Sequence, residues 1–314
     1  MAALLETFAS FIPGVILRHL EADPRPISEP VSYGFPAAVL FADISGFTHL
    51  AERFAERGPV GVEDLSRLLN QYFGQLIDLI GAHGGDVVKF AGDGLLALWP
   101  AIGEPLDTAA LRAAQCGLAI QETLHNYLAA EGVRLSMRVG IGAGEVSVVH
   151  LGGVYQRWEP LVVGEPLAQV SRAEQAALPG EVLLSPEAWQ LVRVNCIGTP
   201  LHTLREHNGK GLPVDEVRLE SVRLPIALRS ASPLARLSRI EESSIRAYIP
   251  GAILYRLLAG QSGWLAELRR LTILFVNLPT LTHHTRLEQA QTVIRALQGS
   301  LYRYEGSINK LSVD

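Results

Sequence analysis

A ten-residue segment near the start of the chain occurs twice, and this repeat is the strongest constraint on what the chain can fold into. FIPGVILRHL (11–20) recurs as YIPGAILYRL (248–257), with six of the ten positions identical. Two weaker pairs follow in the same order. AAVLFADISGFTHL (37–50) aligns with LTILFVNLPTLTHH (271–284), and GDVVKFAGD (85–93) aligns with GSINKLSVD (306–314). Matches that keep one order along the chain indicate a duplicated domain.

The repeat divides the chain into four parts. We expect an N-terminal helix and linker over residues 1–36, a first complete copy over 37–228, a linker and helix over 229–270, and the truncated start of a second copy over 271–314. The second copy stops inside its predicted hairpin, which would leave half of the ladder hydrogen bonds unmade. We therefore expect the chain to be a fragment of a longer protein.

Hydrophobic periodicity predicts the helices and strands of the first copy. It predicts helices at 4–20, broken near Pro13, and at 47–55, 63–82, 107–130 and 164–177. Short apolar runs predict strands at 37–43, 135–141, 145–150, 158–164, 181–184 and 216–224, and residues 84–99 predict a hairpin around a Gly-Asp turn. Strands alternating with helices are typical of an α+β or α/β fold in which helices cover a sheet.

Composition excludes several classes of protein. A hydrophobic content of 48% excludes a mainly disordered chain, and a net charge of −5 argues against nucleic-acid binding. The two cysteines, Cys116 and Cys196, form no disulfide framework or zinc motif and are typical of buried thiols. No apolar run approaches the ~20 residues that a membrane-spanning helix needs. We therefore expect a cytoplasmic protein that binds neither nucleic acid nor membrane.

Two aspartates lie where chemistry is expected. Asp43 ends the strand 37–43, and Asp93 lies at the turn of the hairpin 84–99. Residues 44–48 turn from the strand into a helix, whose free backbone amides favour a phosphate group. If the two strands are neighbours, both carboxylates face one site that can hold two divalent ions and a triphosphate. The alternative interpretation is structural: Asp43 caps the helix and Asp93 shapes the turn.

Two motifs together resemble a known family. FADISGFTHLAERF (41–54) and GGDVVKFAGDGLLALW (84–99) are similar to the catalytic domain of class III nucleotidyl cyclases. The resemblance is strongest to the soluble, bicarbonate-responsive adenylyl cyclase group, which carries two cyclase domains in tandem. It implies an α+β fold with a ferredoxin-like βααββαβ core, sheet covered by helices, and nucleotide sites at the interface of two such domains.

The resemblance also implies the activity and the site. The activity would be conversion of ATP to 3′,5′-cyclic AMP and pyrophosphate by two-metal-ion catalysis. Asp43, Asp93 and the carbonyl of Ile44 would hold two Mg²⁺ or Mn²⁺ ions, and Lys310 would bind adenine. The other implied substrate-binding residues are Ser45, Gly46, Phe47 and Thr48, and the implied catalytic arginine is Arg172.

A second, degenerate pocket is implied by the same resemblance. In this pocket Asn277 replaces the first metal-binding aspartate, and the family places bicarbonate between a lysine and an arginine. Lys89, Val162 and Arg172 are the candidate residues of this anion pocket. The position of the arginine itself holds Ser171, one residue before Arg172, so we expect a weak or absent bicarbonate response.

Two other functions stay open at this point. The first is a non-catalytic cyclase-homology module that binds nucleotide or an anion and regulates another domain, and the presence of both Asp43 and Asp93 favours the enzyme over it. The second is a guanylyl cyclase, which Lys310 disfavours because glutamate at that position would favour guanine. The expected partner is a second cyclase domain, in the same chain or in a homodimer.

Overall fold

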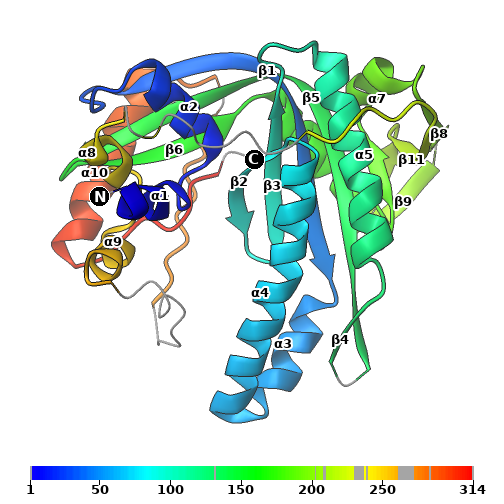
Figure 1. Ribbon diagram of the computed structural model, residues 1–314, viewed down its shortest axis with the longest axis horizontal. Helices are drawn as coiled ribbons and strands as arrows, with labels where there is room; N and C mark the ends of the chain where they lie inside the picture. Colours follow the sequence, from blue (N-terminus) through cyan, green and yellow to red (C-terminus); the bar gives the residue numbers. More distant parts are fainter. Residues whose placement is uncertain are drawn as a thin grey trace. The chain divides into compact units, whose positions relative to one another are not determined.

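The chain forms two compact units, each built from segments that are distant in the sequence. The larger unit comprises residues 35–145 and 165–232, and the smaller unit comprises residues 1–34, 146–164 and 233–314. The structure, a computed structural model, describes residues 2–130, 132–201, 203–207, 210–229, 237, 240–260, 272–282 and 284–312 (Figure 1). Among these residues, no helix is long and apolar enough to cross a membrane.

Helices and strands alternate along much of the chain. The helices are α1 (Ala2–Ala9), α2 (Gly14–Ala22), α3 (Phe47–Ala55), α4 (Gly58–Ala82), α5 (Leu106–Leu124), α6 (Glu165–Ala176), α7 (Pro186–Val192), α8 (Glu242–Arg246), α9 (Gly251–Leu258) and α10 (Leu287–Arg303). The strands are β1 (Val31–Ser45), β2 (Asp86–Ala91), β3 (Gly94–Pro100), β4 (Tyr127–Ala130), β5 (Val133–Val154), β6 (Arg157–Val163), β7 (Val182–Leu184), β8 (Cys196–Pro200), β9 (Thr203–His207), β10 (Lys210–Val214) and β11 (Val217–Val222).

A mixed sheet forms the centre of the larger unit. Its strand order is β2-β3-β1-β5-β7-β11-β8. The pairs β2–β3 and β1–β3 are antiparallel, whereas β5 and β7 are parallel. Helices α4 and α5 lie side by side across one face (Figure 1). This arrangement confirms the expected α+β fold with a sheet covered by helices.

Successive residues of β1 and β5 point to opposite faces of the sheet, and this alternation separates an apolar core from a polar face. Ala42 and Ile44 of β1 and Val139 of β5 belong to the buried cluster, together with residues of α4 and α5. Asp43 and Arg138 alternate with these core residues, so they lie on the other face of the sheet. The hydrophobic pattern of the two strands therefore determines which face carries charge.

Most predicted elements of the first copy are confirmed, with three corrections. The helix predicted over 107–130 ends at Leu124, and residues 127–130 form strand β4 instead. The strands predicted at 135–141 and 145–150 are one continuous strand, β5, because the residues between them remain extended. The prediction missed α7, β8, β9 and β10, which are short and lack a clear period.

The repeated segment is helical at both of its positions in the chain, whereas the segment that aligns with β1 is not a strand. Helix α9 begins at Gly251 after Pro250, as α2 begins at Gly14 after Pro13, and the two prolines have nearly identical φ angles of −52° and −53°. The segment that aligns with β1 has no strand assignment over residues 272–277. Its side chains Ile273, Leu274 and Phe275 are exposed. The domain boundaries expected from the repeat stay a prediction.

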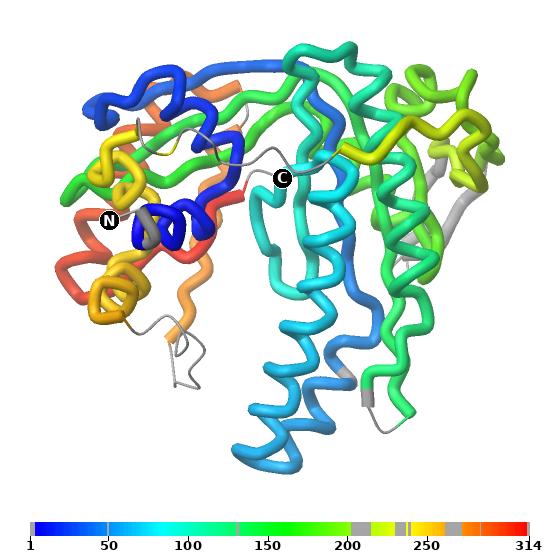
Figure 2. The backbone as a smooth tube through the Cα atoms, in the orientation of Figure 1, coloured from blue at the N-terminus to red at the C-terminus, as the bar shows by residue number. Residues whose placement is uncertain are grey.

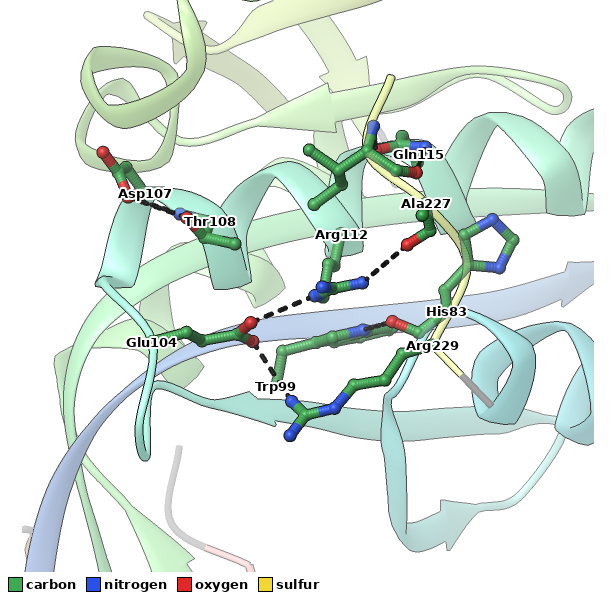
Figure 3. A network of polar contacts seen from close by, with 10 residues as sticks. His83, Trp99, Glu104, Asp107, Thr108, Arg112, Gln115, Ala227 and Arg229 are labelled. Carbon is green, nitrogen blue, oxygen red and sulfur yellow. Dashed lines mark hydrogen bonds and ion pairs between the residues drawn. The ribbon is translucent and has the colours of Figure 1, made fainter. Parts of the chain in front are cut away.

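A short segment after β11, residues 224–229, is bound to α5, and we call it the strap. Ile226 forms a pair of hydrogen bonds with the side chain of Gln115. Its amide donates to Gln115 Oε1 at 3.0 Å, and its carbonyl accepts from Gln115 Nε2 at 3.1 Å. Arg112 donates to the carbonyl of Ala227 at 3.1 Å (Figure 3). The side chain of Gln115 therefore forms the pair of backbone hydrogen bonds with Ile226 that a neighbouring strand would otherwise form.

The strap continues to the end of α4. The amide of Arg229 donates to the carbonyl of Ala82 at 3.1 Å, and Figure 2 traces the segment from α5 to this point. Glu104 forms ion pairs with Arg112 at 3.3 Å and with Arg229 at 3.5 Å (Figure 3). The strap is thus attached to both helices that cover the core.

Four aromatic side chains pack together in the smaller unit. His19 of α2 stacks on Tyr33 with ring centroids 4.3 Å apart, and His150 of β5 lies 5.4 Å from His19. The Tyr248 hydroxyl is hydrogen-bonded to Nδ1 of His150 at 2.7 Å. His150 is fully buried, and its Nε2 has no hydrogen-bond partner among the described residues. Burial, followed by the charge of His19, lowers the pKa of His150 to about 3.

The strap predicts a measurable contribution to stability. Replacing Gln115 with Ala removes two hydrogen bonds to Ile226, so we expect Gln115→Ala to lower the free energy of unfolding by about 1–2 kcal/mol. Urea unfolding measures this change. The control is Glu122→Ala, an exposed position of the same helix. Equal stability of the two variants would show that the strap contributes nothing to folding.

The buried histidine predicts acid sensitivity. The folded pKa of His150 lies below its ordinary value, so the unfolded chain binds more protons. The stability present above about pH 6.5 is therefore lost as the pH falls, by up to about 1.4 kcal/mol per pH unit. Urea unfolding between about pH 7 and pH 5 should show a shallower slope for His150→Gln than for wild type. The exposed-site variant His125→Gln should keep the wild-type slope.

Candidate active site

The two predicted carboxylates lie at adjacent strand ends. Asp43 of β1 is directly opposite Gly94 of β3 in the antiparallel register. Asp93 lies next to Gly94 in the two-residue loop Gly92-Asp93, which joins β2 to β3. Gly92 has a φ of +71°, the left-handed conformation that such a tight turn favours for glycine. The predicted Gly-Asp hairpin is confirmed, and it brings Asp93 beside the end of β1.

An arginine that we did not single out joins this pair. Arg138 of β5 donates from Nη2 to Asp43 Oδ2. The same Nη2 atom lies 2.9 Å from Oε1 of Glu174, on α6. The second contact is an ion pair without hydrogen-bond geometry, since Glu174 Oε1 has no hydrogen-bond partner among the described residues. One guanidinium nitrogen therefore bridges two carboxylates.

Two acids of this cluster, Asp93 and Glu174, have raised pKa values. Burial, followed by the charge of Asp43, raises the pKa of Asp93, and Arg138 opposes this rise. The pKa of Glu174 is raised to about 7, chiefly by burial. The charge of Arg138 opposes this rise, and the charges of Asp43 and Asp93 add to it. Two acidic side chains, Asp43 and Glu174, thus contact one arginine, and Asp93 interacts electrostatically with both Asp43 and Arg138. Such a site has an excess of negative charge that a cation would neutralise.

The start of α3 lies directly after Asp43. Gly46 is the N-cap of α3, with a φ of +94°, and a Cβ there would lie 3.2 Å from the carbonyl of Arg134. The positive φ explains why a glycine ends this turn. No side chain caps the helix, which excludes the alternative in which Asp43 is a helix cap. Of the other predicted substrate-binding residues, Ser45 ends β1, and Phe47 and Thr48 begin α3.

The carboxylate pair fits a divalent metal ion. Mg²⁺ is usually bound through one or two carboxylates together with phosphate oxygens of the substrate. Asp43 and Asp93 could provide two such ligands. Burial, followed by the charge of Asp43, raises the pKa of Asp93, so a bound cation would relieve the repulsion between the two carboxylates. Within the described part of the chain, no group of three or more histidine, cysteine or acidic residues could hold a metal alone. The carbonyl of Ile44 as a further ligand stays a prediction.

The remaining predicted residues are distributed over both units. Arg172 of α6 is exposed and forms an ion pair with Glu165 at 3.3 Å. Lys89 lies in β2, and Val162 is buried in β6 of the smaller unit. Lys310 and Asn277 are exposed residues of the smaller unit. The structure brings together Asp43 and Asp93, while the roles of Lys310, Arg172 and the anion-pocket residues stay predictions.

Arg138 and Glu174 are the members of the site that sequence reasoning missed. Arg138 is a lone charge in the apolar strand SMRVGI, and its alternation with Met137 and Val139 places it on the face opposite the core. Glu174 follows Ala173 on the buried side of α6. A charge inside an apolar pattern is the signal that could have found both residues.

Comparisons with known proteins agree with this geometry. Residues 34–211 match the model of the adenylate and guanylate cyclase catalytic domain. The chain therefore belongs to this family of nucleotide cyclase catalytic domains, which confirms the resemblance seen in the sequence. Adenylate cyclase type 10 of Oryctolagus cuniculus is 30% identical over 300 residues, covering 86% of this chain and 18% of the relative. The chain spans about a fifth of the length of such relatives.

Solved structures show the same fold. The adenylyl cyclase CyaB from P. aeruginosa is 25% identical, with a TM-score of 0.52, over 63% of this chain and 100% of that chain. The guanylyl cyclase Cya2 is 29% identical, with a TM-score of 0.52, over 64% of this chain and 99% of that chain. The expected class III cyclase fold is thereby confirmed.

The coupling between the carboxylates predicts a shift that can be measured without metal. Asp43→Asn removes a negative charge beside Asp93 and frees Arg138, so we expect it to lower the pKa of Asp93. Titration of the Asp93 carboxyl carbon by NMR measures this pKa. The control is Asp107→Asn, at the start of α5. An unchanged pKa would show that burial alone perturbs Asp93.

Proposed function

We propose that this protein is an adenylyl cyclase that converts ATP to 3′,5′-cyclic AMP and pyrophosphate. The observation that carries the proposal is the pair of carboxylates, Asp43 and Asp93, at the ends of neighbouring strands and beside the uncapped start of α3. Carboxylates suit divalent cations, and free amides at a helix N-terminus suit phosphate oxygens. A magnesium–nucleotide complex combines both chemical features.

The reaction is an intramolecular phosphoryl transfer. The ribose 3′-oxygen forms a bond to the α-phosphorus, the bond from the α-phosphorus to the bridging oxygen breaks, the hydroxyl proton is released, and pyrophosphate leaves. Divalent cations, Mg²⁺ or Mn²⁺, supply charge neutralisation and acidify the attacking hydroxyl when bound. Asp43 and Asp93 would hold two such ions, and residues 44–48 would orient the triphosphate with their backbone groups. In the structure, Arg138 forms an ion pair with Asp43.

Adenine specificity rests on Lys310 and on the relatives. A lysine at this position suits the ring nitrogen of adenine, which accepts a hydrogen bond. The relative named adenylate cyclase type 10 covers most of this chain, whereas the solved neighbours include an adenylyl and a guanylyl cyclase. The name of the first relative supports ATP as the substrate. GTP is the alternative that a product assay must exclude.

The proposed site needs a second cyclase domain. Lys310 belongs to the second copy of the repeat, so the nucleotide would bind between two copies, in one chain or in a homodimer. The proposed anion pocket, with Lys89, Val162 and Arg172, belongs to the other, degenerate site. Arg172 is already paired with Glu165, and Ser171 stands where an arginine is expected. We therefore expect little or no activation by bicarbonate.

The test is a product assay on the full-length protein with ATP and GTP, in Mg²⁺ and in Mn²⁺. We expect cyclic AMP from ATP, and Asp43→Asn or Asp93→Asn should each reduce turnover by at least about 100-fold, because each removes a metal-bound anion. The matched control Asp107→Asn should retain wild-type turnover, and circular dichroism confirms folding of each variant.

Three results would contradict the proposal. Cyclic GMP as the main product would assign a guanylyl cyclase. Near wild-type turnover in either aspartate variant would remove the metal assignment. Nucleotide binding without any product, under all four conditions, would favour a regulatory module over an enzyme.

A further inference from the structure

We propose that Glu174 is a positioning residue of the metal site, which acts by holding Arg138 so that Asp43 is available to a divalent cation. This inference rests on the proposed function, because it takes Asp43 as a metal ligand. It adds a residue of α6 to a site that otherwise consists of β1 and the β2–β3 hairpin.

Arg138 lies between two carboxylates, and either one can be its ion-pair partner. Its Nη2 atom contacts both Asp43 Oδ2 and Glu174 Oε1. The three side chains are only 9–22% exposed, so water screens these interactions weakly. The Nε atom of Arg138 is buried and has no hydrogen-bond partner among the described residues. Arg138 is therefore bound through one edge of its guanidinium, and a small rotation would shift it toward either acid.

Glu174 is held rigidly enough to serve this role. Helix α6 packs directly on β5 at Gly140, two residues after Arg138. A Cβ at Gly140 would lie 2.4 Å from the carbonyl oxygen of Val170 and 2.7 Å from the amide of Glu174. The glycine thus allows the helix backbone to contact the strand. The backbone of Glu174 is fixed against the same strand that carries Arg138.

Charge explains why the site needs this second acid. A guanidinium paired with Asp43 competes with a divalent cation for the same oxygen atoms. Glu174 offers Arg138 another anion, so a cation can bind Asp43 without leaving the arginine buried and unpaired. Without the charge of Glu174, Arg138 would pair with Asp43 alone. Cation binding would then have to break that ion pair.

The test measures binding of Mn²⁺ alone, without nucleotide, by the electron paramagnetic resonance signal of free Mn²⁺. It uses the full-length protein at about pH 8, where carboxylates are ionised. We expect Glu174→Gln to raise the Kd for Mn²⁺ by about 10-fold, as loss of residues around a metal's ligands typically does. Arg138→Gln should lower the Kd, because it removes the competing cation. Adding Glu174→Gln to Arg138→Gln should then change the Kd less than about twofold.

Controls separate this role from a structural one. Glu165→Gln makes the same charge change at an exposed position of α6 and should leave the Kd unchanged. Glu174→Asp keeps the charge and should restore most of the affinity. If Glu174→Gln does not fold, the Arg138→Gln variant still tests the proposal. Weaker Mn²⁺ binding in Arg138→Gln would show that Arg138 does not compete with the cation, and the proposal would be overturned.

The remaining outcomes are also decisive. An unchanged Kd in Glu174→Gln, or the same loss in the presence and absence of Arg138, would overturn the positioning role while leaving the metal site intact. A wild-type protein that binds no Mn²⁺, or an Asp43→Asn variant that binds it equally well, would overturn the proposed function and this inference with it.

Discussion

The two faces of strand β1 lie in different environments, an apolar core on one side and a charged cluster on the other. The rest of the larger unit depends on this separation. Ala42 and Ile44 enter the apolar core, while Asp43 between them lies with Arg138 on the other face. A slip of one residue would put the carboxylate into the core and the apolar side chains beside the charges, at a cost of several kcal/mol. The pairing of Asp43 with Gly94 therefore sets the core and the candidate site in a single register.

The polar face of this sheet concentrates more charge than a structural role requires. Asp43 and Glu174 contact one arginine, and burial raises the pKa of Glu174 and of the nearby Asp93. An arrangement of this kind is costly for folding, because partly buried carboxylates repel one another. Perturbed acids in one place are a common feature of functional sites. The proposed binding of a cation and a polyanion would give a reason for this cost.

The sequence was sufficient to predict those residues of the candidate site whose positions depend on local structure. It was not sufficient for residues that only tertiary contacts bring together. Asp43 and Asp93 could be found because a strand end and a Gly-Asp turn are local features. Glu174 and Arg138 could not be paired, since only the packing of α6 on Gly140 brings them together. The predicted helix over 107–130 overran Leu124 because residues 127–130 keep apolar character while pairing with β5. Nothing local shows that the apolar segment 272–277 forms no strand with the residues that the structure describes.

The strap has a consequence for the order of events during synthesis. Gln115 and Ile226 are separated by 111 residues, so the helix that receives the strap leaves the ribosome well before the strap exists. At ordinary translation rates this delay is on the order of ten seconds, much longer than a helix or a hairpin takes to form. The sheet and its covering helices therefore have time to assemble first, with the strap docking onto a surface that is already folded. Its attachment therefore comes last in the assembly of the larger unit.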